Sequence, residues 1–135
     1  MEKKDLLKDV IKHIDIKSYN STELIDAMRN MSFTSRDTAR AADILMMMCK
    51  EKECTNILTL AGSTSAAGCM QVYVDMVRNK MIDVVVATGA SIIDMDLFEA
   101  LGFKHYIGEK ENVIADTTLR DLYIDRIYDT YIDEE

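Results

Sequence analysis

Two short apolar runs separated by one helical stretch place the strongest constraint on the fold of this chain. The runs cover residues 56–61 and 83–88, and glycines follow them at Gly62 and Gly89. Continuous apolar strands of this length are typical of a parallel sheet that is covered on both faces. Apolar residues at helical spacing over 64–79 supply the crossover that parallel neighbours need. The pattern therefore predicts a β-α-β unit with two buried strands.

Helices are predicted for much of the remaining chain. Apolar spacing indicates them over about 3–13, 22–31, 34–51 and 91–101, with Asn and Thr residues as caps of the second and third. Lys104–Ile107 is a candidate for a third, shorter strand. The expected fold class is α/β, a Rossmann-like parallel sheet flanked by helices, with an α-helical N-terminal region.

Length and composition favour one soluble structural unit. The chain has 135 residues, of which 48% are hydrophobic and 30% charged. We expect a helical N-terminal region over 1–52, followed over 53–135 by the first part of an α/β domain. No apolar run reaches the length of about 18 residues that a membrane span needs. Because no apolar leader follows the first residues, we expect a cytoplasmic protein without membrane association.

The charge balance excludes one class of partner and suits another. Sixteen Lys and Arg against 24 Asp and Glu give a net charge of −8. Non-specific nucleic-acid binding needs a basic surface, so no nucleic-acid partner is expected. A polyamine or a lysine-bearing protein suits the charge better, although acidity can also serve solubility alone. Three cysteines without metal-ligand spacing indicate free thiols, and no metal site is expected.

Small residues follow both predicted strands, at the end of a parallel sheet where ligands bind. They form the stretches Ala61–Gly68 and Ala87–Ser91. Such turns let a backbone approach a phosphate closely, but they match neither G-x-G-x-x-G nor a P-loop. Tight packing of helix against strand explains them equally well. Asp94 and Asp96 follow in the next helix, where they could bind a cation or ribose hydroxyls, or form an acidic helix start.

Spaced matches along most of the chain resemble deoxyhypusine synthase and its deoxyhypusine-synthase-like relatives. Gly68 is followed after twelve residues by Met81-Ile82-Asp83-Val84-Val85-Val86-Ala87-Thr88-Gly89-Ala90, in the family's pattern of glycine, helix, M-[VI]-D, strand and T-G-A turn. Residues 33–41, with their Arg-Ala pair, resemble the upstream segment. Leu119-Arg120 and Ile124-Asp125-Arg126-Ile127 resemble the downstream one. About one extra residue lies between Ser91 and Asp96.

The resemblance implies an NAD-dependent aminobutyl transferase. In the family, spermidine gives up hydride to NAD and loses diaminopropane, and an enzyme lysine carries the butylimine to a lysine of the hypusine-bearing translation factor. Carried over by position, the contacts with NAD would come from Gly62, Ser63, Thr64, Ser65, Ala66, Thr88, Gly89 and Ala90. Asp94 would stand near both NAD and spermidine. The family also implies a tetrameric core with NAD near subunit interfaces.

The same resemblance implies that half of the enzyme lies elsewhere. The family's Schiff-base lysine belongs to a C-terminal half, so no catalytic residue is assigned here, and Lys104 and Lys110 do not take that position. We expect a C-terminal complementary polypeptide that carries the lysine, with a split gene, processing or truncation as its possible origins. Two alternatives stay open. The first is homospermidine formation with putrescine as acceptor, because residues 127–131 resemble the synthase-like branch. The second is a non-catalytic regulatory subunit.

Overall fold

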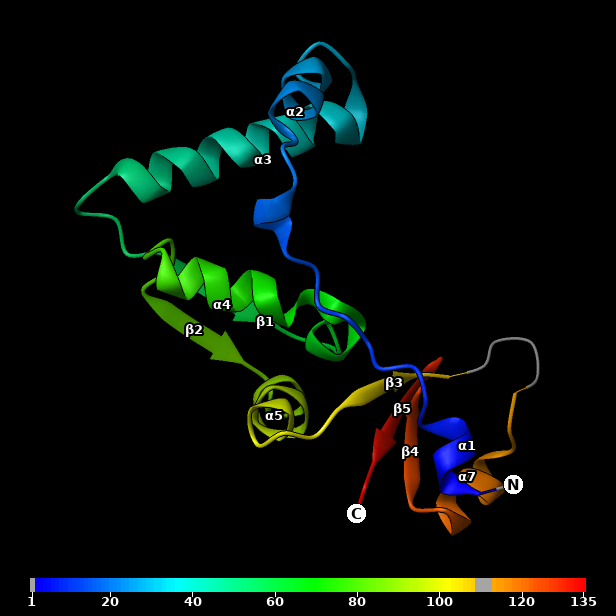
Figure 1. Cartoon of the computed structure of the whole chain (residues 1–135). Helices are drawn as coiled ribbons and strands as arrows, with labels where there is room; N and C mark the ends of the chain where they lie inside the picture. The colour runs from blue at the N-terminus through cyan, green and yellow to red at the C-terminus, as the bar shows by residue number, and fades with distance from the viewer. Residues whose placement is uncertain (1, 109–112) are drawn as a thin grey trace. The chain divides into compact units, whose positions relative to one another are not determined.

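The computed structural model describes residues 2–108 and 113–135, and the contacts within the chain divide it into two compact units (Figure 1). The first unit comprises Met1–Ile14, Leu60–Gln71 and Ala87–Glu135. The second comprises Asp15–Thr59 and Val72–Val86. Each unit is described by itself. The predicted organisation into residues 1–52 and 53–135 stays a prediction.

The second unit contains a pair of packed helices. A short 3-10 turn, η1 (Ile16–Ser18), precedes α2 (Thr22–Met28), and α3 (Phe33–Lys50) packs on α2. The caps predicted at Asn20 and Thr34 are wrong, because Ser21 and Ser32 occupy the N-cap positions of α2 and α3. Asn20 Oδ1 still accepts a hydrogen bond of 3.0 Å from the amide of Thr22, just before the helix. Arg29, just after α2, pairs with Asp26 of the same helix and with Asp43 of α3, and the pair with Asp43 joins the two helices.

The predicted β-α-β unit is confirmed. Strands β1 (Ile57–Leu60) and β2 (Val84–Ala87) form a two-stranded sheet, and α4 (Met70–Arg78) lies between them in sequence. The carbonyl of Asn56 accepts from the amide of Asp83 at 2.9 Å, and that of Leu60 accepts from Thr88 at 3.2 Å. Both strands advance in the same direction between these bonds, so they are parallel.

Buried Asn56 aligns the beginning of the two strands. Its backbone amide donates to Asp83 Oδ2 at 2.8 Å, and its side-chain amide donates to the carbonyl of Met81 at 3.0 Å. The Met-Ile-Asp sequence at 81–83 therefore has a structural role. Two of its three residues accept hydrogen bonds from Asn56, which directly precedes the first strand.

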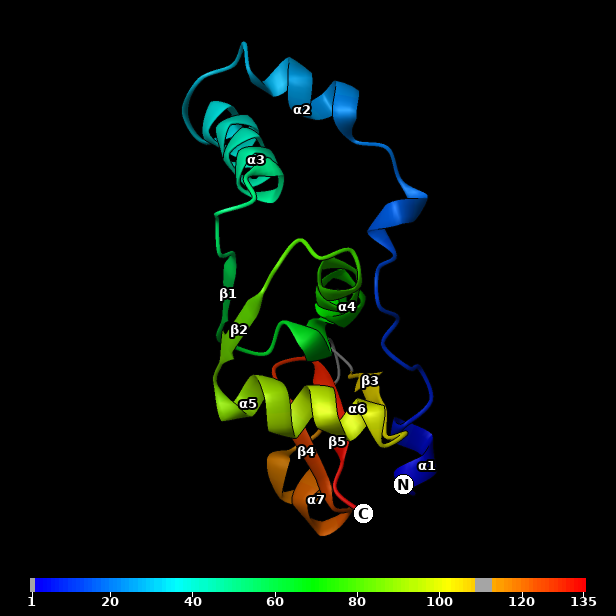
Figure 2. The same ribbon diagram turned by 90° about the vertical axis from the view of Figure 1, so that its left-hand side faces the viewer.

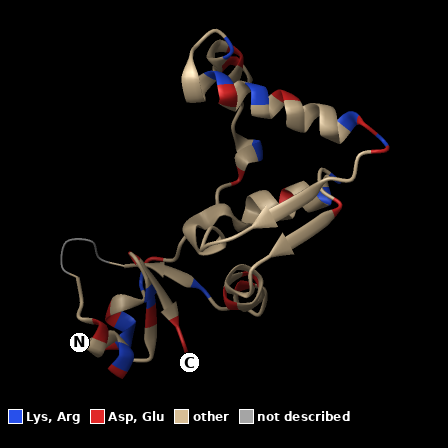
Figure 3. Cartoon of the chain, turned by 180° about the vertical axis from the view of Figure 1, so that it is seen from behind, with Lys and Arg blue, Asp and Glu red and all other residues tan. Residues whose placement is uncertain are grey.

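The prediction that both strands are buried is wrong for this chain. Ile57 and Val86 are each 56% exposed, and Val84 and Val85 are exposed as well. Figure 3 shows both strands free of charged residues along their length. The apolar pattern is that of a strand covered on both faces, but the described residues supply only two strands to this sheet.

In the first unit, residues Gly89–Ala100 form one continuous helix, as Figure 2 shows. It consists of α5 (Gly89–Ser91), the π-helical segment η3 (Ile92–Leu97) and α6 (Phe98–Ala100). A π-helical turn accommodates one residue more than an α-helical turn. The helix ends at Gly102, whose φ is +106°, with the amide of Phe103 donating to the carbonyl of Phe98 at 3.1 Å.

A second, antiparallel sheet completes the first unit. It contains β3 (His105–Ile107), β4 (Ile124–Ile127) and β5 (Thr130–Asp133) in the order β3-β5-β4. Tyr106 lies opposite Tyr131, and Arg126 lies opposite Tyr131 on the other side. The strand expected at 104–107 is thus present, but it joins this sheet and not the parallel one. The β4–β5 hairpin was not predicted.

Helices α1 (Lys3–Leu6) and α7 (Asp116–Asp121) contribute to the core of this unit. The core consists of four buried side chains from α1, α7, β4 and β5: Leu6, Leu119, Ile124 and Tyr131. The helix predicted over 3–13 is wrong beyond Leu6, because residues 9–11 pair with β3 instead. The amide of Ile11 donates to the carbonyl of His105 at 2.8 Å, and Val10 forms an antiparallel bridge with Tyr106.

Candidate functional site

The turns that follow β1 and β2 lie side by side in the first unit. The buried hydroxyl of Ser91 donates a hydrogen bond of 2.8 Å to the carbonyl of Gly62, and it lies 3.3 Å from Thr88 Oγ1. Gly62 has a φ of +80°, a conformation that favours glycine. A Cβ atom at Gly62 or at Gly89 would meet no other atom within 4 Å. The backbone of both turns therefore borders open space.

The first turn continues into the π-type segment η2 (Ser65–Cys69), which is kinked at Gly68 with a φ of +95°. The amide of Cys69 donates to the carbonyl of Thr64 at 3.0 Å. Ser65 and Ala66 are buried, and Ser65 Oγ has no hydrogen-bond partner among the described residues. Of the residues expected to contact NAD in this turn, Gly62 and Ser63 border open space. The side chains of Ser65 and Ala66 are buried instead.

A cavity of about 490 Å³ brings three of the expected site residues together. Ser63 follows β1, Ala90 lies one residue after Gly89, and Asp94 belongs to η3. Met95 and Phe98 of the same helix also line it. The remaining lining residues come from the antiparallel sheet and the residue after it: Asp125, Ile127, Ile132, Asp133 and Glu134.

The cavity is acidic. Asp94, Asp125, Asp133 and Glu134 line it, without a lysine or arginine among the described lining residues. Lys3 approaches from outside that set, with its Nζ 2.5 Å from Asp133 Oδ1. Burial opposes the charge of Lys3, but its hydrogen bonds to Asp133 and Glu135 outweigh burial and raise the pKa of Lys3. Three further carboxylates give the cavity a potential that attracts cations.

The π-helical segment decides which aspartate faces the cavity. Asp94 lines it, whereas Asp96 does not, and Met95 between them is buried. Asp96 Oδ1 is buried without a hydrogen-bond partner among the described residues. Sequence position alone could not predict which of the two aspartates faces the cavity. Each extra residue in a helical turn rotates all the later residues about the helix axis.

Ser91 was placed in the second turn but not among the predicted contact residues, and the acidic residues of the C-terminal hairpin were not predicted to reach the site. The alternating pattern of Ile124-Asp125-Arg126-Ile127 and Thr130-Tyr131-Ile132-Asp133 was the signal for strands, with the two residues between them as a tight turn.

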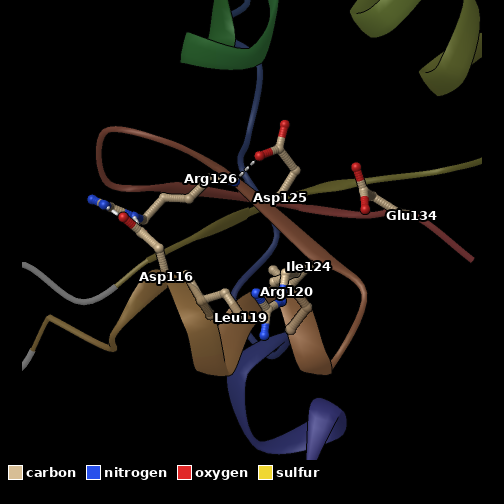
Figure 4. Close-up of a pocket in the computed structure, with 7 residues that line it drawn as sticks. All are labelled: Asp116, Leu119, Arg120, Ile124, Asp125, Arg126 and Glu134. Atoms are coloured by element: carbon tan, nitrogen blue, oxygen red, sulfur yellow. Dashed lines mark hydrogen bonds and ion pairs between the residues drawn. The ribbon is translucent and has the colours of Figure 1, made fainter.

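A second cavity of about 400 Å³ lies between α7 and β4 (Figure 4). Arg126 points from β4 toward α7, where its Nε and Nη2 donate to Asp116 Oδ1 at 2.9 and 2.7 Å. Its Nη1 donates to the carbonyl of Tyr128 at 3.1 Å. The guanidinium thus ties the hairpin to α7, which gives the Leu119–Ile127 segment a structural role.

Within the part of the chain that the structure describes, no three His, Cys, Asp or Glu side chains are grouped so that they could hold a metal ion. Cys49, Cys54 and Cys69 carry free thiols, as predicted. None of the described helices is both long and apolar enough to cross a membrane.

The described residues form an α/β protein with its candidate site at the carboxyl ends of two parallel strands. Residues 23–135 match the sequence model of the family named deoxyhypusine synthase. The chain therefore belongs to the deoxyhypusine synthase family, and the resemblance inferred from the spaced motifs is confirmed.

Three relatives are each named "Deoxyhypusine synthase-like protein". The chain is 64% identical to the one from Caulobacter vibrioides over 134 residues, which cover 99% of this chain and 36% of that protein. It is 59% identical to the one from Coxiella burnetii, covering 98% and 37%. For Chlorobaculum tepidum the identity is 53%, covering 100% and 38%. The chain thus spans less than two-fifths of the length of these relatives.

Proposed function

We propose that this chain is the NAD-binding half of a deoxyhypusine-synthase-family enzyme. The enzyme transfers the aminobutyl group of spermidine to a lysine of the hypusine-bearing translation factor. The observation that carries the proposal is the contact between the two strand-end turns, where Ser91 joins Gly62 beside a cavity that reaches Asp94.

The residues of the turns fit a dinucleotide. Open space beside Gly62 and Gly89 lets backbone groups approach a pyrophosphate without a side chain between them. Ser63 and Thr88 offer hydroxyls, and Ser91 fixes the spacing of the two turns. Bound there, NAD would accept a hydride from the substrate and later return it. The buried Ser65 and Ala66 support the turn from below.

The acidic cavity supports a polyamine as the second ligand. Asp94, Asp125 and Glu134 can each accept hydrogen bonds from an ammonium group, and their charges attract a polycation. Asp94 borders the cofactor turn as well as the cavity, because Ser63 and Ala90 line the same space. We assign Asp94 the role of holding an amine of spermidine next to the cofactor.

A C-terminal complementary polypeptide supplies the catalytic lysine in this proposal. The relatives are more than twice as long as this chain, which supports a missing half. The exposed apolar side chains of β1 and β2 support further strands beside or over the pair, within a Rossmann-like sheet and a tetrameric core.

Homospermidine formation is a second candidate, with putrescine in place of the protein lysine as acceptor. The relatives with 53–64% identity carry the name "Deoxyhypusine synthase-like protein", and this naming favours the synthase-like branch. A small diamine acceptor also suits an acidic cavity. The two candidates share the NAD site and the donor, so they differ only in the final acceptor.

An activity assay on the complex purified from its source tests the proposal. Spermidine should cause NAD-dependent release of diaminopropane, and replacement of Asp94 by Ala should abolish most of it. Labelled product in the translation factor supports protein modification, whereas labelled homospermidine supports the second candidate. Activity of the partner alone would instead favour a regulatory subunit. Absence of NAD binding by the complex contradicts the proposal.

A further inference from the structure

Residues 9–14, here called the strap, connect β3 to the kink of η2. At one end, the amide of Ile107 donates to the carbonyl of Asp9 at 2.7 Å, and that of Ile11 donates to His105 at 2.8 Å. The strap therefore pairs with β3 as an additional edge strand. At the other end, the amide of Ile14 donates to the carbonyl of Gly68 at 2.9 Å.

Gly68 fits closely beneath the strap. A Cβ atom at this position would lie 3.0 Å from the carbonyl oxygen of Lys12 and 3.8 Å from Ile11 Cγ2. The close approach and the φ of +95° both favour glycine. Gly68 lies within η2, which begins at Ser65, and the amide of Ala67 donates back to the carbonyl of Ser63 at 3.0 Å. Movement of the strap would thus release one side of the candidate cofactor turn.

A buried carboxylate holds the strap from the opposite side. Glu99 of α6 pairs with His13 of the strap, Oε2 to Nε2, at 2.5 Å. Its other oxygen, Oε1, pairs with Nδ1 of His105 at 2.7 Å. The side chain of Glu99 is 9% exposed, and that of His105 is 2% exposed. One carboxylate therefore joins three segments of the first unit: the strap, β3 and the helix that also carries Asp94.

Nothing else described in the structure replaces this carboxylate. His13 Nδ1 and His105 Nε2 are buried without hydrogen-bond partners among the described residues. Loss of Glu99 would leave the buried imidazole of His105 and the half-buried imidazole of His13 without their carboxylate partner, which is costly. The three groups lie outside the lining of the acidic cavity, so the proposed chemistry does not account for them.

We propose that Glu99 is a positioning residue for the cofactor turn. It holds His13, the strap then holds Gly68, and Gly68 fixes the turn that contains Ser63. This inference rests on the proposed function only in taking NAD as the ligand of the turn.

The test compares NAD affinity and amide hydrogen exchange in the full chain and three variants. Glu99→Ala removes both imidazole contacts and should raise the dissociation constant for NAD about tenfold. Glu99→Gln keeps one acceptor and gains a donor, so it should stay within about threefold of the wild type. Leu119→Ala serves as a matched destabilised control in the same unit: it should lower the melting temperature without changing NAD affinity.

Hydrogen exchange separates this inference from the proposed function. Glu99→Ala should accelerate exchange at the amides of Ile14, Ala67 and Cys69, whether or not NAD binds. If the complex that contains the wild-type chain does not bind NAD, the proposed function fails, and exchange at these amides still decides whether the strap holds the turn. Unchanged exchange, or an equal loss of NAD affinity in Leu119→Ala, would overturn the inference. If Glu99→Ala does not fold, His13→Leu takes its place, since it removes only the contact of the strap.

Discussion

The hydroxyl of Ser91 donates a hydrogen bond of 2.8 Å to the carbonyl of Gly62, and this bond joins the ends of two parallel strands. Ser91 is fully buried and follows β2, whereas Gly62 follows β1. The two partners are 29 positions apart in the sequence. The bond thus defines the spacing of the two turns from which the proposed cofactor site is built.

Replacement of Ser91 by Ala should weaken this arrangement. The carbonyl of Gly62 loses its hydroxyl donor, so the free energy of unfolding should fall by about 1–2 kcal/mol. NAD affinity should fall too, because the two turns are no longer fixed. Chemical denaturation and calorimetric titration with NAD measure the two effects. Ser18→Ala, at an exposed serine that bonds Asp15, is the matched control and should change neither. If Ser91→Ala changes neither the free energy of unfolding nor the affinity for NAD, this bond does not fix the two turns.

Two glycines allow stability and binding to be separated. Gly89 has no positive φ and open space beside it, so Gly89→Ala should leave the melting temperature unchanged or slightly higher. The added methyl group should nevertheless weaken NAD binding about tenfold, because it keeps the pyrophosphate from the backbone.

Gly102→Ala should show the opposite behaviour. Its φ of +106° makes a side chain unfavourable by about 1–2 kcal/mol, but it lies outside the proposed site. We therefore expect a lower melting temperature with unchanged NAD affinity. If both glycine variants bind NAD like the wild type, Gly89 does not contact the cofactor.

The ion pair between Lys17 and Asp75 should make stability depend on pH at the alkaline end. Lys17 Nζ donates to the buried Asp75 at 2.7 Å, and this hydrogen bond, opposed by desolvation, raises the pKa of Lys17 above 10.5. A raised lysine pKa contributes stability that is fully present below the unfolded pKa and is lost as pH rises through the folded pKa.

A comparison of the wild type with Lys17→Met isolates this contribution. The difference in melting temperature should be constant from about pH 6 to 9 and should shrink only above the ordinary lysine pKa. A difference that increases with pH would contradict the assignment. Lys4→Met, which removes the exposed pair between Lys4 and Glu2, is the control and should have little effect at any pH.

The exposed strands should cause the isolated chain to associate. Val86 is 56% exposed on β2 and belongs to an apolar pair of strands. Val86→Lys should shift the sedimentation profile of the purified chain toward the monomer, because a charge interrupts the apolar surface. Leu24→Lys, at a leucine that is 60% exposed on α2, should not. Equal effects of the two substitutions would indicate non-specific association instead.

The β-α-β unit could be predicted because its strands are continuous apolar runs and its crossover has helical spacing. The exposure of those strands could not, because a continuous apolar run does not reveal how many strands and helices surround it, and the described residues supply two strands to this sheet. The family could be inferred from the order of several motifs, of which 81–83 and 119–127 have structural roles in alignment and packing.

The strap and the hairpin show where local pattern fails. Leu6, Leu7, Val10 and Ile11 fit a helix equally well, but β3 offers backbone partners from Asp9 onward, and these override the spacing. The hairpin places acidic residues near Asp94, a juxtaposition between distant segments that spacing along the chain does not contain.

Native mass spectrometry of the chain purified from its source under mild conditions tests the central claim most directly. We expect a stoichiometric second polypeptide of similar or larger size, in a complex that retains NAD. The chain found alone, or as a homo-oligomer without the cofactor, would contradict its role as the NAD-binding half of an enzyme.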